Sequence, residues 1–296
     1  MVGMHRRTVI KALAVAAGTT SLAACSAEPA AGPPASSAPA SLKPKSREKL
    51  PKAPASAYAL TQTKLALDHG KNRPLPTTVW QPDGDGPYPL ILFSHGLTAA
   101  PADYTELVTT WARAGFVVAA PAYPHTARGV TDYNPLDVLN QPADASAVLT
   151  QVLSRLKGTV DPDRIAAAGH SAGAITTLGL LSNRDDRVRA AVVLAGRQIV
   201  TTPLTGAPAP ILFVHGKQDR TVAYADGRAA YNAVTWPKAF LTVTTGGHVA
   251  SGRSLDVIAA TSTDFWRWTL YGDAAAKARI PADATRGELA TLTNQL

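Results

Sequence analysis

The sequence predicts an α/β protein built on a mainly parallel sheet with helices on both faces. β-rich apolar runs alternate along the chain with helical patterns. Runs such as Leu90–Phe93 and Phe116–Ala120 are continuously apolar rather than alternating, which is typical of strands buried on both faces. The 296 residues, 46% hydrophobic and 17% charged, are enough for a sizeable core.

The expected elements begin near Tyr58. Eight strands are expected near residues 61–66, 76–81, 89–94, 116–121, 164–168, 190–194, 210–215 and 239–244. Helices are expected near residues 103–114, 141–157, 172–182, 223–234 and 255–270. We expect a folded domain over 58–272, and a C-terminal tail over the polar residues 273–296. The irregular segment 122–142 is long for a loop and is a candidate wall of a cleft.

Residues 1–24 have the features of an export signal. Paired arginines, Arg6 and Arg7, precede a short and weakly apolar run, which resembles a twin-arginine signal and is too short for a membrane span. The run ends Leu22–Cys25, which resembles a bacterial lipobox. That resemblance implies cleavage before Cys25 and lipid attachment to its sulfur, and two acyl chains would anchor the protein stably. Ordinary secretory cleavage near Ala24, which would release the protein from the cell, is the alternative.

Residues 25–57 predict a disordered tether, because they are rich in Ala, Pro and Ser and end in a basic patch. The formal net charge of the chain is +8. Residues 1–57 contain eight Lys or Arg and two Asp or Glu, so most of the excess lies before the folded domain. A basic face for nucleic acid is therefore not expected. Cys25 is the single cysteine, which excludes an intrachain disulfide.

The pentad Gly169–Gly173 predicts a nucleophile elbow at Ser171. An apolar strand precedes it and an apolar helix follows it, which is the strand–turn–helix setting that projects a serine hydroxyl at a sheet edge. The two glycines let helix and strand approach closely. The backbone N–H of Ala172 would lie at a helix N-terminus and stabilise an oxyanion. A glycine-rich turn without chemistry is the alternative.

Three further strand ends carry residues that suit this chemistry. A glycine turn follows the strand ending at Ser94, and the backbone N–H of Leu97 is the candidate second oxyanion donor, unless this is a plain turn. Asp219 follows the turn at Gly216, after the strand expected at 210–215, and would orient a histidine. Asp226 is the rival candidate for this role. His248 follows a glycine pair and would act as the general base.

These motifs together resemble the α/β-hydrolases. The resemblance rests on SHGLTAAPADYTELVTTWARAGFVVAAPAYPHT, NQPADASAVLTQVL, GHSAG and FVHGKQD, and on the chain order Ser171, Asp219, His248. Over residues 60 to 272 the chain is similar to dienelactone-hydrolase-like and bacterial platelet-activating-factor-acetylhydrolase-like lipases. It differs from true dienelactone hydrolases, which carry a cysteine nucleophile. It also differs from bacterial cutinases, which have methionine after the serine and a C-terminal disulfide.

The resemblance implies an α/β-hydrolase fold with a mostly parallel eight-stranded sheet, and an exported serine hydrolase that cleaves carboxylic esters. Its substrate would be a small-molecule ester or lipid, and it would need neither metal nor organic cofactor. The expected location is bacterial, at the cell membrane through the lipid anchor or outside the cell. A catalytically inactive binding protein and an amidase or peptidase remain alternatives. Acyl chain length and oligomeric state stay open.

Overall fold

The computed structural model describes residues 52–183, 185–199, 204 and 206–296. The chain divides into two units, Met1–Arg47 and Glu48–Leu296, and every described residue belongs to the second. The expected signal peptide at 1–24, the lipid-attachment residue Cys25 and most of the expected tether at 25–57 lie outside the described residues.

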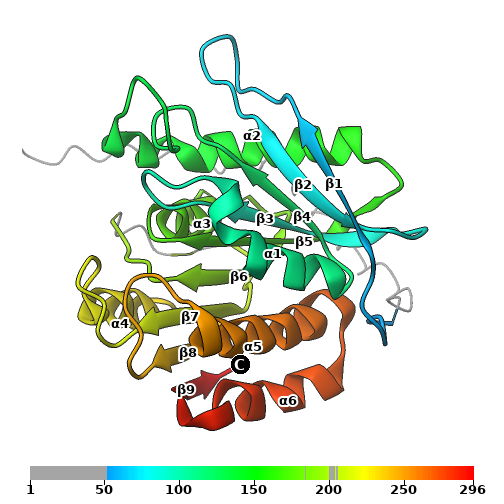
Figure 1. The fold of residues 1–296 in the computed structure, drawn as a ribbon. Helices are drawn as coiled ribbons and strands as arrows, with labels where there is room; N and C mark the ends of the chain where they lie inside the picture. Colours follow the sequence, from blue (N-terminus) through cyan, green and yellow to red (C-terminus); the bar gives the residue numbers. More distant parts are fainter. Residues whose placement is uncertain (1–51, 184, 200–203, 205) are drawn as a thin grey trace, which may run out of the picture. The chain divides into compact units, whose positions relative to one another are not determined.

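A nine-stranded sheet forms the centre of the described residues, in the order β1-β2-β4-β3-β5-β6-β7-β8-β9 (Figure 1). The six strands from β4 to β8 in that order pair in parallel, and β1, β2 and β9 are antiparallel to their neighbours. The strands are β1 (Leu60–Leu65), β2 (Thr77–Pro82), β3 (Tyr88–Ser94), β4 (Val117–Pro121), β5 (Val160–His170), β6 (Val188–Leu194), β7 (Ile211–Gly216), β8 (Lys238–Val243) and β9 (Ala290–Gln295).

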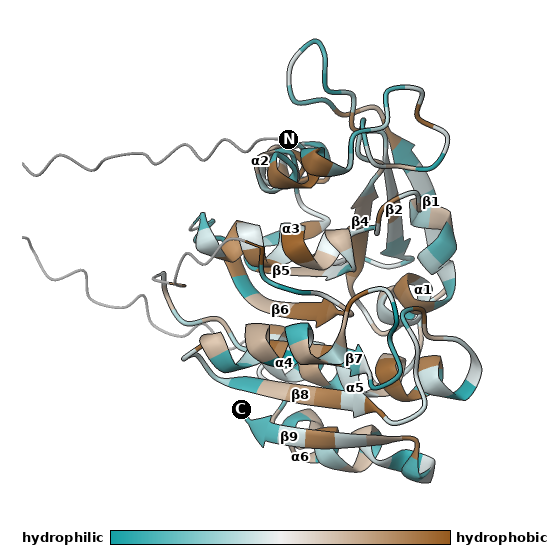
Figure 2. Ribbon diagram, turned by 90° about the vertical axis from the view of Figure 1, so that its left-hand side faces the viewer, coloured by the Kyte–Doolittle hydropathy of each residue, from teal (hydrophilic) through white to brown (hydrophobic). Residues whose placement is uncertain are grey.

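Helices cover both faces of this sheet, as Figure 2 shows. One face carries α1 (Thr105–Arg113), α5 (Gly252–Tyr271) and α6 (Ala274–Ala284), and the other carries α2 (Gln141–Arg155), α3 (Ala172–Ser182) and α4 (Tyr224–Ala233). Short 3-10 turns are η1 (Pro101–Tyr104), η2 (Pro135–Leu139) and η3 (Arg286–Glu288). None of the helices within the described ranges has both the length and the apolar character that a membrane crossing needs.

The strand β3 shows why the predicted strands read as unbroken apolar runs. Leu90 and Leu92 pack into the core under α2, α3 and α4, whereas Ile91 and Phe93 pack into the core under α1, α5 and α6. Successive side chains of a strand point to opposite faces, so a strand covered on both sides must be apolar at every position. The architecture confirms the predicted α/β class and is an α/β-hydrolase fold.

The loops after β3 and β5 begin at the same edge of the sheet. These strands are parallel neighbours, and Ser94 lies opposite Gly169. From β3 the chain passes over α1 to β4 on one side, whereas from β5 it passes over α3 to β6 on the other. The strand order therefore reverses here, which is where open α/β sheets leave a crevice for ligands.

The expected C-terminal tail at 273–296 is wrong, and the sheet has nine strands rather than eight. Residues of this segment form α6 and then β9, which pairs antiparallel with β8 along its whole length. Ile280 of α6 is fully buried, and Ala290 of β9 is nearly so. Ala276 and Ala284 are also fully buried, whereas most polar side chains of the segment are exposed, so a few apolar contacts fix it to the domain.

The start of the packed domain also differs from the expected boundary at 58. A guanidinium N–H of Arg267 in α5 donates a hydrogen bond of 3.1 Å to the carbonyl of Pro54. Ala53 packs against the core under α5. Residues 53 and 54 therefore belong to the folded domain rather than to a tether.

We predict that Ile280→Ala lowers the free energy of unfolding by about 2–5 kcal/mol, because it leaves a cavity between α6 and the sheet. Ile280→Val should cost about 0.5–1.5 kcal/mol. Urea denaturation followed by circular dichroism measures both. Thr291→Ala, at an exposed position of β9, is the control and should change stability by no more than about 0.5 kcal/mol. If Ile280→Ala behaved like the control, the C-terminal segment would not be part of the core.

Candidate active site

Ser171 lies in the sharp turn between β5 and α3. Its backbone has φ 56° and ψ −116°, a strained conformation for a residue other than glycine. A Cβ on Gly173 would lie 1.9 Å from the carbonyl oxygen of Ser94, and a Cβ on Gly169 would lie 2.1 Å from that of Gly173. Both positions therefore require glycine, and the geometry is that of a nucleophile elbow.

Asp219 follows β7, and its side chain is completely buried. One carboxylate oxygen accepts hydrogen bonds from the N–H groups of Thr221 at 2.8 Å and Val222 at 2.9 Å. The other oxygen lies 2.8 Å from Nδ1 of His248 and 3.3 Å from Nε2 of His215. Burial alone would raise the pKa of Asp219, but the hydrogen bonds from His248, Val222 and Thr221 outweigh it and lower the pKa. Asp219 thus stays ionised.

The carboxylate that contacts His248 is Asp219 and not its rival Asp226, which lies in α4. A carboxylate can only accept, so Nδ1 of His248 carries the proton in this hydrogen bond, and Nε2 of the neutral ring has a free lone pair. The loop that carries His248 passes close to the end of β7, since a Cβ on Gly216 would lie 2.2 Å from the carbonyl oxygen of Gly247. Another glycine turn therefore sets the position of this histidine.

The Ser171 hydroxyl makes no hydrogen bond to His248 or to any other group among the described residues. Its side chain is only partly buried, and it lies beside Gly96, where an added Cβ would be 3.3 Å from that of Ser171. Hydrogen bonds between nucleophile and base are often long before substrate binds. The structure therefore brings Asp219 and His248 into direct contact, and it leaves the link to Ser171 open.

The two expected oxyanion donors flank the same turn. The N–H groups of Leu97 and Ala172 donate no hydrogen bond within the described part of the chain. Thr98, next to Leu97, has φ 56°, so this loop is also strained. Its N–H donates to the carbonyl of Thr126 at 2.8 Å, and the N–H of Arg128 donates to the carbonyl of Ala99 at 2.9 Å. Two hydrogen bonds to the segment after β4 thus fix the position of this loop.

That segment, 122–142, has a different role from the one expected of it. Of its residues, Arg128 lines the cavity described below, whereas Tyr123, His125, Tyr133 and Asn134 do not. Tyr123 is buried, and its hydroxyl lies 2.8 Å from Oγ of Ser94. Its N–H donates to Nε2 of His95 at 3.0 Å. Through Tyr123, the segment holds Ser94 and His95 at the end of β3 in place.

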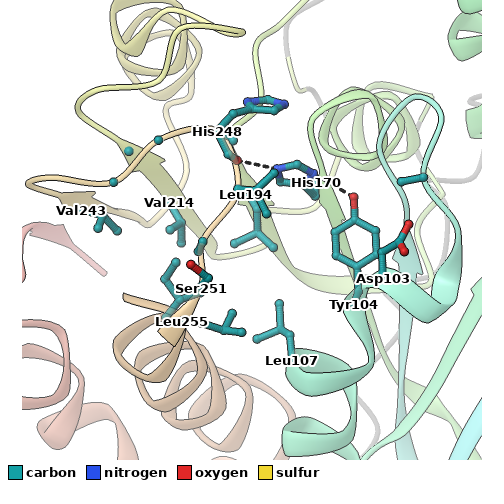
Figure 3. A pocket seen from close by; sticks show the side chains of 18 of the residues that line it. Asp103, Tyr104, Leu107, His170, Leu194, Val214, Val243, His248, Ser251 and Leu255 are labelled. Carbon is teal, nitrogen blue, oxygen red and sulfur yellow. Dashed lines mark hydrogen bonds between the residues drawn. The ribbon is translucent and has the colours of Figure 1, made fainter. Parts of the chain in front are cut away.

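His170, directly before Ser171, links the elbow to two other loops. Its Nε2 lies 2.7 Å from the carbonyl oxygen of His248, and its Nδ1 lies 2.9 Å from the hydroxyl of Tyr104 (Figure 3). The Tyr104 oxygen also accepts a hydrogen bond of 3.0 Å from the N–H of Gly96. Burial lowers the pKa of His170 to about 4 and raises that of Tyr104 to about 12, so both side chains are neutral near pH 7.

Sequence reasoning missed these contacts of Tyr104 and His170. His170 lies inside the predicted elbow, and Tyr104 is one of two aromatic residues in the helix expected at 103–114. Tyr104 and His170 lie 66 positions apart, and their spacing does not predict a contact between them.

A cavity of about 540 Å³ opens beside this turn. Figure 3 shows side chains from the loop after β3, α1, β6, β7, β8 and α5 pointing into it. Ser171 does not line it, but Leu97, His170 and His248 do. Most of the other lining side chains are apolar, among them Leu107, Leu194, Val214, Val243, Val249, Leu255 and Ile258. The ion pair of Arg128 and Asp103 lies at one side. The cavity suits an apolar group next to the elbow.

No cluster of three or more His, Cys, Asp or Glu side chains that could hold a metal ion occurs in the ranges that the structure covers. Asp219, His215 and His248 meet, but each ring nitrogen near the carboxylate is engaged as a hydrogen-bond donor. The arrangement is suited to orienting an imidazole.

The sheet with helices on both faces, and the strained serine in the turn after β5, have the geometry of the α/β-hydrolase fold. The model of the Chlorophyllase family, a family of α/β-hydrolase type, matches residues 55–195. No curated protein matches the chain. The matched residues span β1 to β6 and include Leu97, Ser171 and Ala172, whereas Asp219 and His248 lie beyond them. The similarity to chlorophyllases supports a hydrolase of the esterase type.

We predict that His170 makes the protein sensitive to acid. Its pKa is about 4 in the folded protein and roughly 6.5 when unfolded, so on acidification the unfolded chain takes up a proton first. The free energy of unfolding should therefore fall between pH 7 and pH 5, by about 2 kcal/mol from this group. His95, whose pKa burial also lowers, adds to the fall.

Urea denaturation of the wild type and of His170→Asn, each at pH 7 and pH 5, checks this. The variant should lose less stability on acidification than the wild type, by about 2 kcal/mol. An equal loss in both proteins would contradict the assignment of a buried, neutral imidazole.

Proposed function

We propose that the protein is a serine hydrolase that cleaves carboxylic esters with apolar acyl groups. Ser171 is the nucleophile, His248 the general base and Asp219 the residue that orients His248. The backbone N–H groups of Leu97 and Ala172 form the oxyanion hole. The observation that carries the proposal is the hydrogen bond from Nδ1 of His248 to a fully buried carboxylate, at the sheet edge where Ser171 has a strained backbone.

The chemistry follows from these positions. Oγ of Ser171 attacks the ester carbonyl carbon while Nε2 of His248 takes the hydroxyl proton, and the carbonyl electron pair moves to the oxygen. The oxyanion accepts hydrogen bonds from Leu97 and Ala172 N–H, each worth roughly 3 kcal/mol of barrier. The carbon–oxygen bond to the alcohol then breaks, and the alcohol leaves with the proton from His248. Water then attacks the acyl carbon while Nε2 of His248 takes a proton from it. The bond to Oγ of Ser171 breaks, the acid leaves, and His248 returns the proton to Ser171.

The buried carboxylate supports this assignment electrostatically. The imidazolium formed when His248 takes the proton lies 2.8 Å from Asp219, whose lowered pKa keeps it ionised. The charge is thus paired from the moment it forms. The Leu97 and Ala172 N–H groups donate to no other described group, so they are free to bind an oxygen of the substrate.

The apolar cavity supports the choice of substrate class. Its walls offer valine, leucine and isoleucine side chains beside the elbow, and burying each CH₂ of an acyl chain gains about 0.8 kcal/mol. Val214, Val243, Leu255 and Ile258 all lie outside the stretch matched by the Chlorophyllase model. The name of that family therefore supports ester hydrolysis more than it supports a chlorophyll substrate, and a chlorophyll ester belongs in the substrate panel as a comparison.

We also propose that the protein is exported and anchored to the membrane by lipid at Cys25. This rests on the sequence of residues 1–25 alone. Incorporation of a labelled fatty acid by the full chain, but not by its Cys25→Ala variant, tests the anchor. Absence of label in the wild type would leave ordinary secretion as the alternative.

We predict that Ser171→Ala reduces kcat for p-nitrophenyl butyrate by roughly 10⁴-fold or more, and Asp219→Asn by roughly 10³- to 10⁴-fold. Neither variant should change the fold. Initial rates and labelling by a fluorophosphonate probe measure the effects. Asp226→Asn removes the rival carboxylate and is the matched control, with activity expected near that of the wild type.

Two results would refute this assignment. Wild-type protein that neither hydrolyses esters nor reacts with the probe would be a binding protein on this fold. Faster hydrolysis of an anilide than of the ester with the same acyl group would make it an amidase.

We predict that Leu255→Trp shifts the acyl preference towards short chains, because the larger side chain fills the cavity that Leu255 lines. The ratio of kcat/KM for octanoate to that for acetate should fall by about 10-fold or more, as expected when two or more CH₂ groups lose their site. Leu136→Trp is the control, since Leu136 is exposed and does not line the cavity. An unchanged ratio would show that the acyl chain binds elsewhere.

A further inference from the structure

We propose that Tyr104 and His170 are positioning residues that clasp the His248 loop and the oxyanion loop against the Ser171 turn. We call the hydrogen-bonded chain Gly96–Tyr104–His170–His248 the clasp. Its catalytic consequence rests on the proposed function, but the clasp itself follows from the hydrogen bonds of the described residues. Figure 3 shows the two bonds that His170 makes, one to each neighbouring loop.

The direction of every hydrogen bond in the clasp is fixed. The His248 carbonyl can only accept, so Nε2 of His170 must carry the proton of the 2.7 Å bond. A neutral imidazole has one N–H, which leaves Nδ1 of His170 to accept the hydroxyl proton of Tyr104 at 2.9 Å. The Tyr104 oxygen in turn accepts from the N–H of Gly96 at 3.0 Å. The N–H of Gly96, the hydroxyl of Tyr104 and Nε2–H of His170 therefore all donate in one direction, towards the His248 carbonyl, and each bond strengthens the next.

The clasp depends on a neutral His170. Residue His170 is 8% exposed, and burial lowers the pKa of its ring to about 4. The ring of His248 faces it at a centroid distance of 4.8 Å, and that of Tyr104 at 5.6 Å. His215 also opposes a charge on His170, whereas Asp219 favours one more weakly than burial opposes it. The one-way arrangement is therefore stable near neutral pH.

The same bonds show that His170 is not itself the base. Nε2 is occupied in donating to a carbonyl, and Nδ1 is occupied in accepting from a hydroxyl. Neither nitrogen is free to take a proton from Ser171. The role left to the ring is to hold its neighbours.

The His248 loop has few other fixed points. Among the described residues, Gly247, Val249 and Ala250 make no hydrogen bond from backbone to backbone, and Val249 is 70% exposed. The two polar ties of this stretch are both at His248: its ring to Asp219, and its carbonyl to His170. The first sets the direction of the ring and the second sets the distance of the loop from the elbow.

The other end of the clasp fixes the oxyanion loop. Gly96 precedes Leu97, and a Cβ on Gly96 would lie 3.2 Å from both the Tyr104 oxygen and Nδ1 of His170. The loop is therefore packed directly on the clasp. One chain of hydrogen bonds thus sets the positions of the donor at Leu97 and the base at His248 relative to Ser171.

Three variants test the clasp. Tyr104→Phe removes the central hydroxyl. His170→Asn keeps an acceptor near the position of Nδ1 but cannot reach the His248 carbonyl, whereas His170→Gln can place an amide N–H near the position of Nε2. We expect kcat for p-nitrophenyl butyrate to fall about 10- to 100-fold in Tyr104→Phe and His170→Asn, with KM within about 3-fold, because catalysis is sensitive to displacements of about 1 Å. His170→Gln should retain more of the kcat than His170→Asn.

Tyr231→Phe is the matched control, since it removes a tyrosine hydroxyl that bonds Gln295 at 3.0 Å, remote from the site. Its kcat should stay near that of the wild type. Circular dichroism and thermal melting establish that each variant is folded. Equal kcat in all variants and the wild type, or equal loss in His170→Gln and His170→Asn, would overturn the positioning role.

Nitrogen NMR of histidine-labelled protein separates the clasp from the proposed function. In the wild type at pH 7, His170 should be neutral and protonated at Nε2. A ring protonated at Nδ1, or a charged ring, would overturn the clasp whatever the activity. If the wild type proves to hydrolyse no ester and to resist fluorophosphonate, the proposed function fails, and the NMR result alone then supports or overturns the clasp.

Discussion

The close approach of helix α3 to the end of β3 is the constraint on which the site depends. With a side chain at position 173, the start of α3 could not lie against the Ser94 carbonyl, because a Cβ would be 1.9 Å from that oxygen. The approach forces the turn between β5 and α3 to be sharp, and Ser171 takes up the strain with a positive φ. It also brings the loop after β3 beside the start of α3, so that Gly96 lies next to Ser171.

The second half of the site must reach this point from a distance. β8 lies three strands from β5, which is roughly 14 Å across the sheet. A residue at the end of β8 could not approach Ser171 directly, so the loop between Val243 and Gly252 carries His248 back over the sheet edge. Asp219 follows the neighbouring strand β7 and meets the histidine there. The position of His248 within this loop is therefore the hardest to fix, and the hydrogen bonds at His248 matter most.

The sequence was a good guide wherever local pattern and tertiary packing agree. All eight predicted strands exist. Strands such as β3 and β4 could be predicted because a strand covered on both faces is apolar at each position, whereas β1 is mostly polar and exposed. The contact between Asp219 and His248 was predicted because glycine turns at parallel strand ends place residues at one edge. β9 was missed because an edge strand exposed on one face has a short, mostly polar sequence, and the pairing with β8 that stabilises it is not local.

The contacts of His170 could not be predicted for a similar reason. They join residues that are 66 and 78 positions apart, and no spacing rule connects a tyrosine at the start of a helix with a histidine in a turn. The contacts of segment 122–142 could not be predicted either, since its backbone makes the hydrogen bonds that fix the loop after β3. Every residue carries the same backbone carbonyl, and every residue but proline the same N–H, so such contacts cannot be predicted from the amino-acid sequence.

The cavity has a consequence for how such a protein can diverge. Its valine, leucine and isoleucine walls from β7, β8 and α5 come from the later part of the chain, whereas the serine turn and the loop after β3 come from the earlier part. The cavity walls of β7, β8 and α5 can therefore change with little disturbance to the serine turn. Recombination between related chains at the β6–β7 connection would exchange the later walls of the cavity and leave the serine turn and the loop after β3 unchanged.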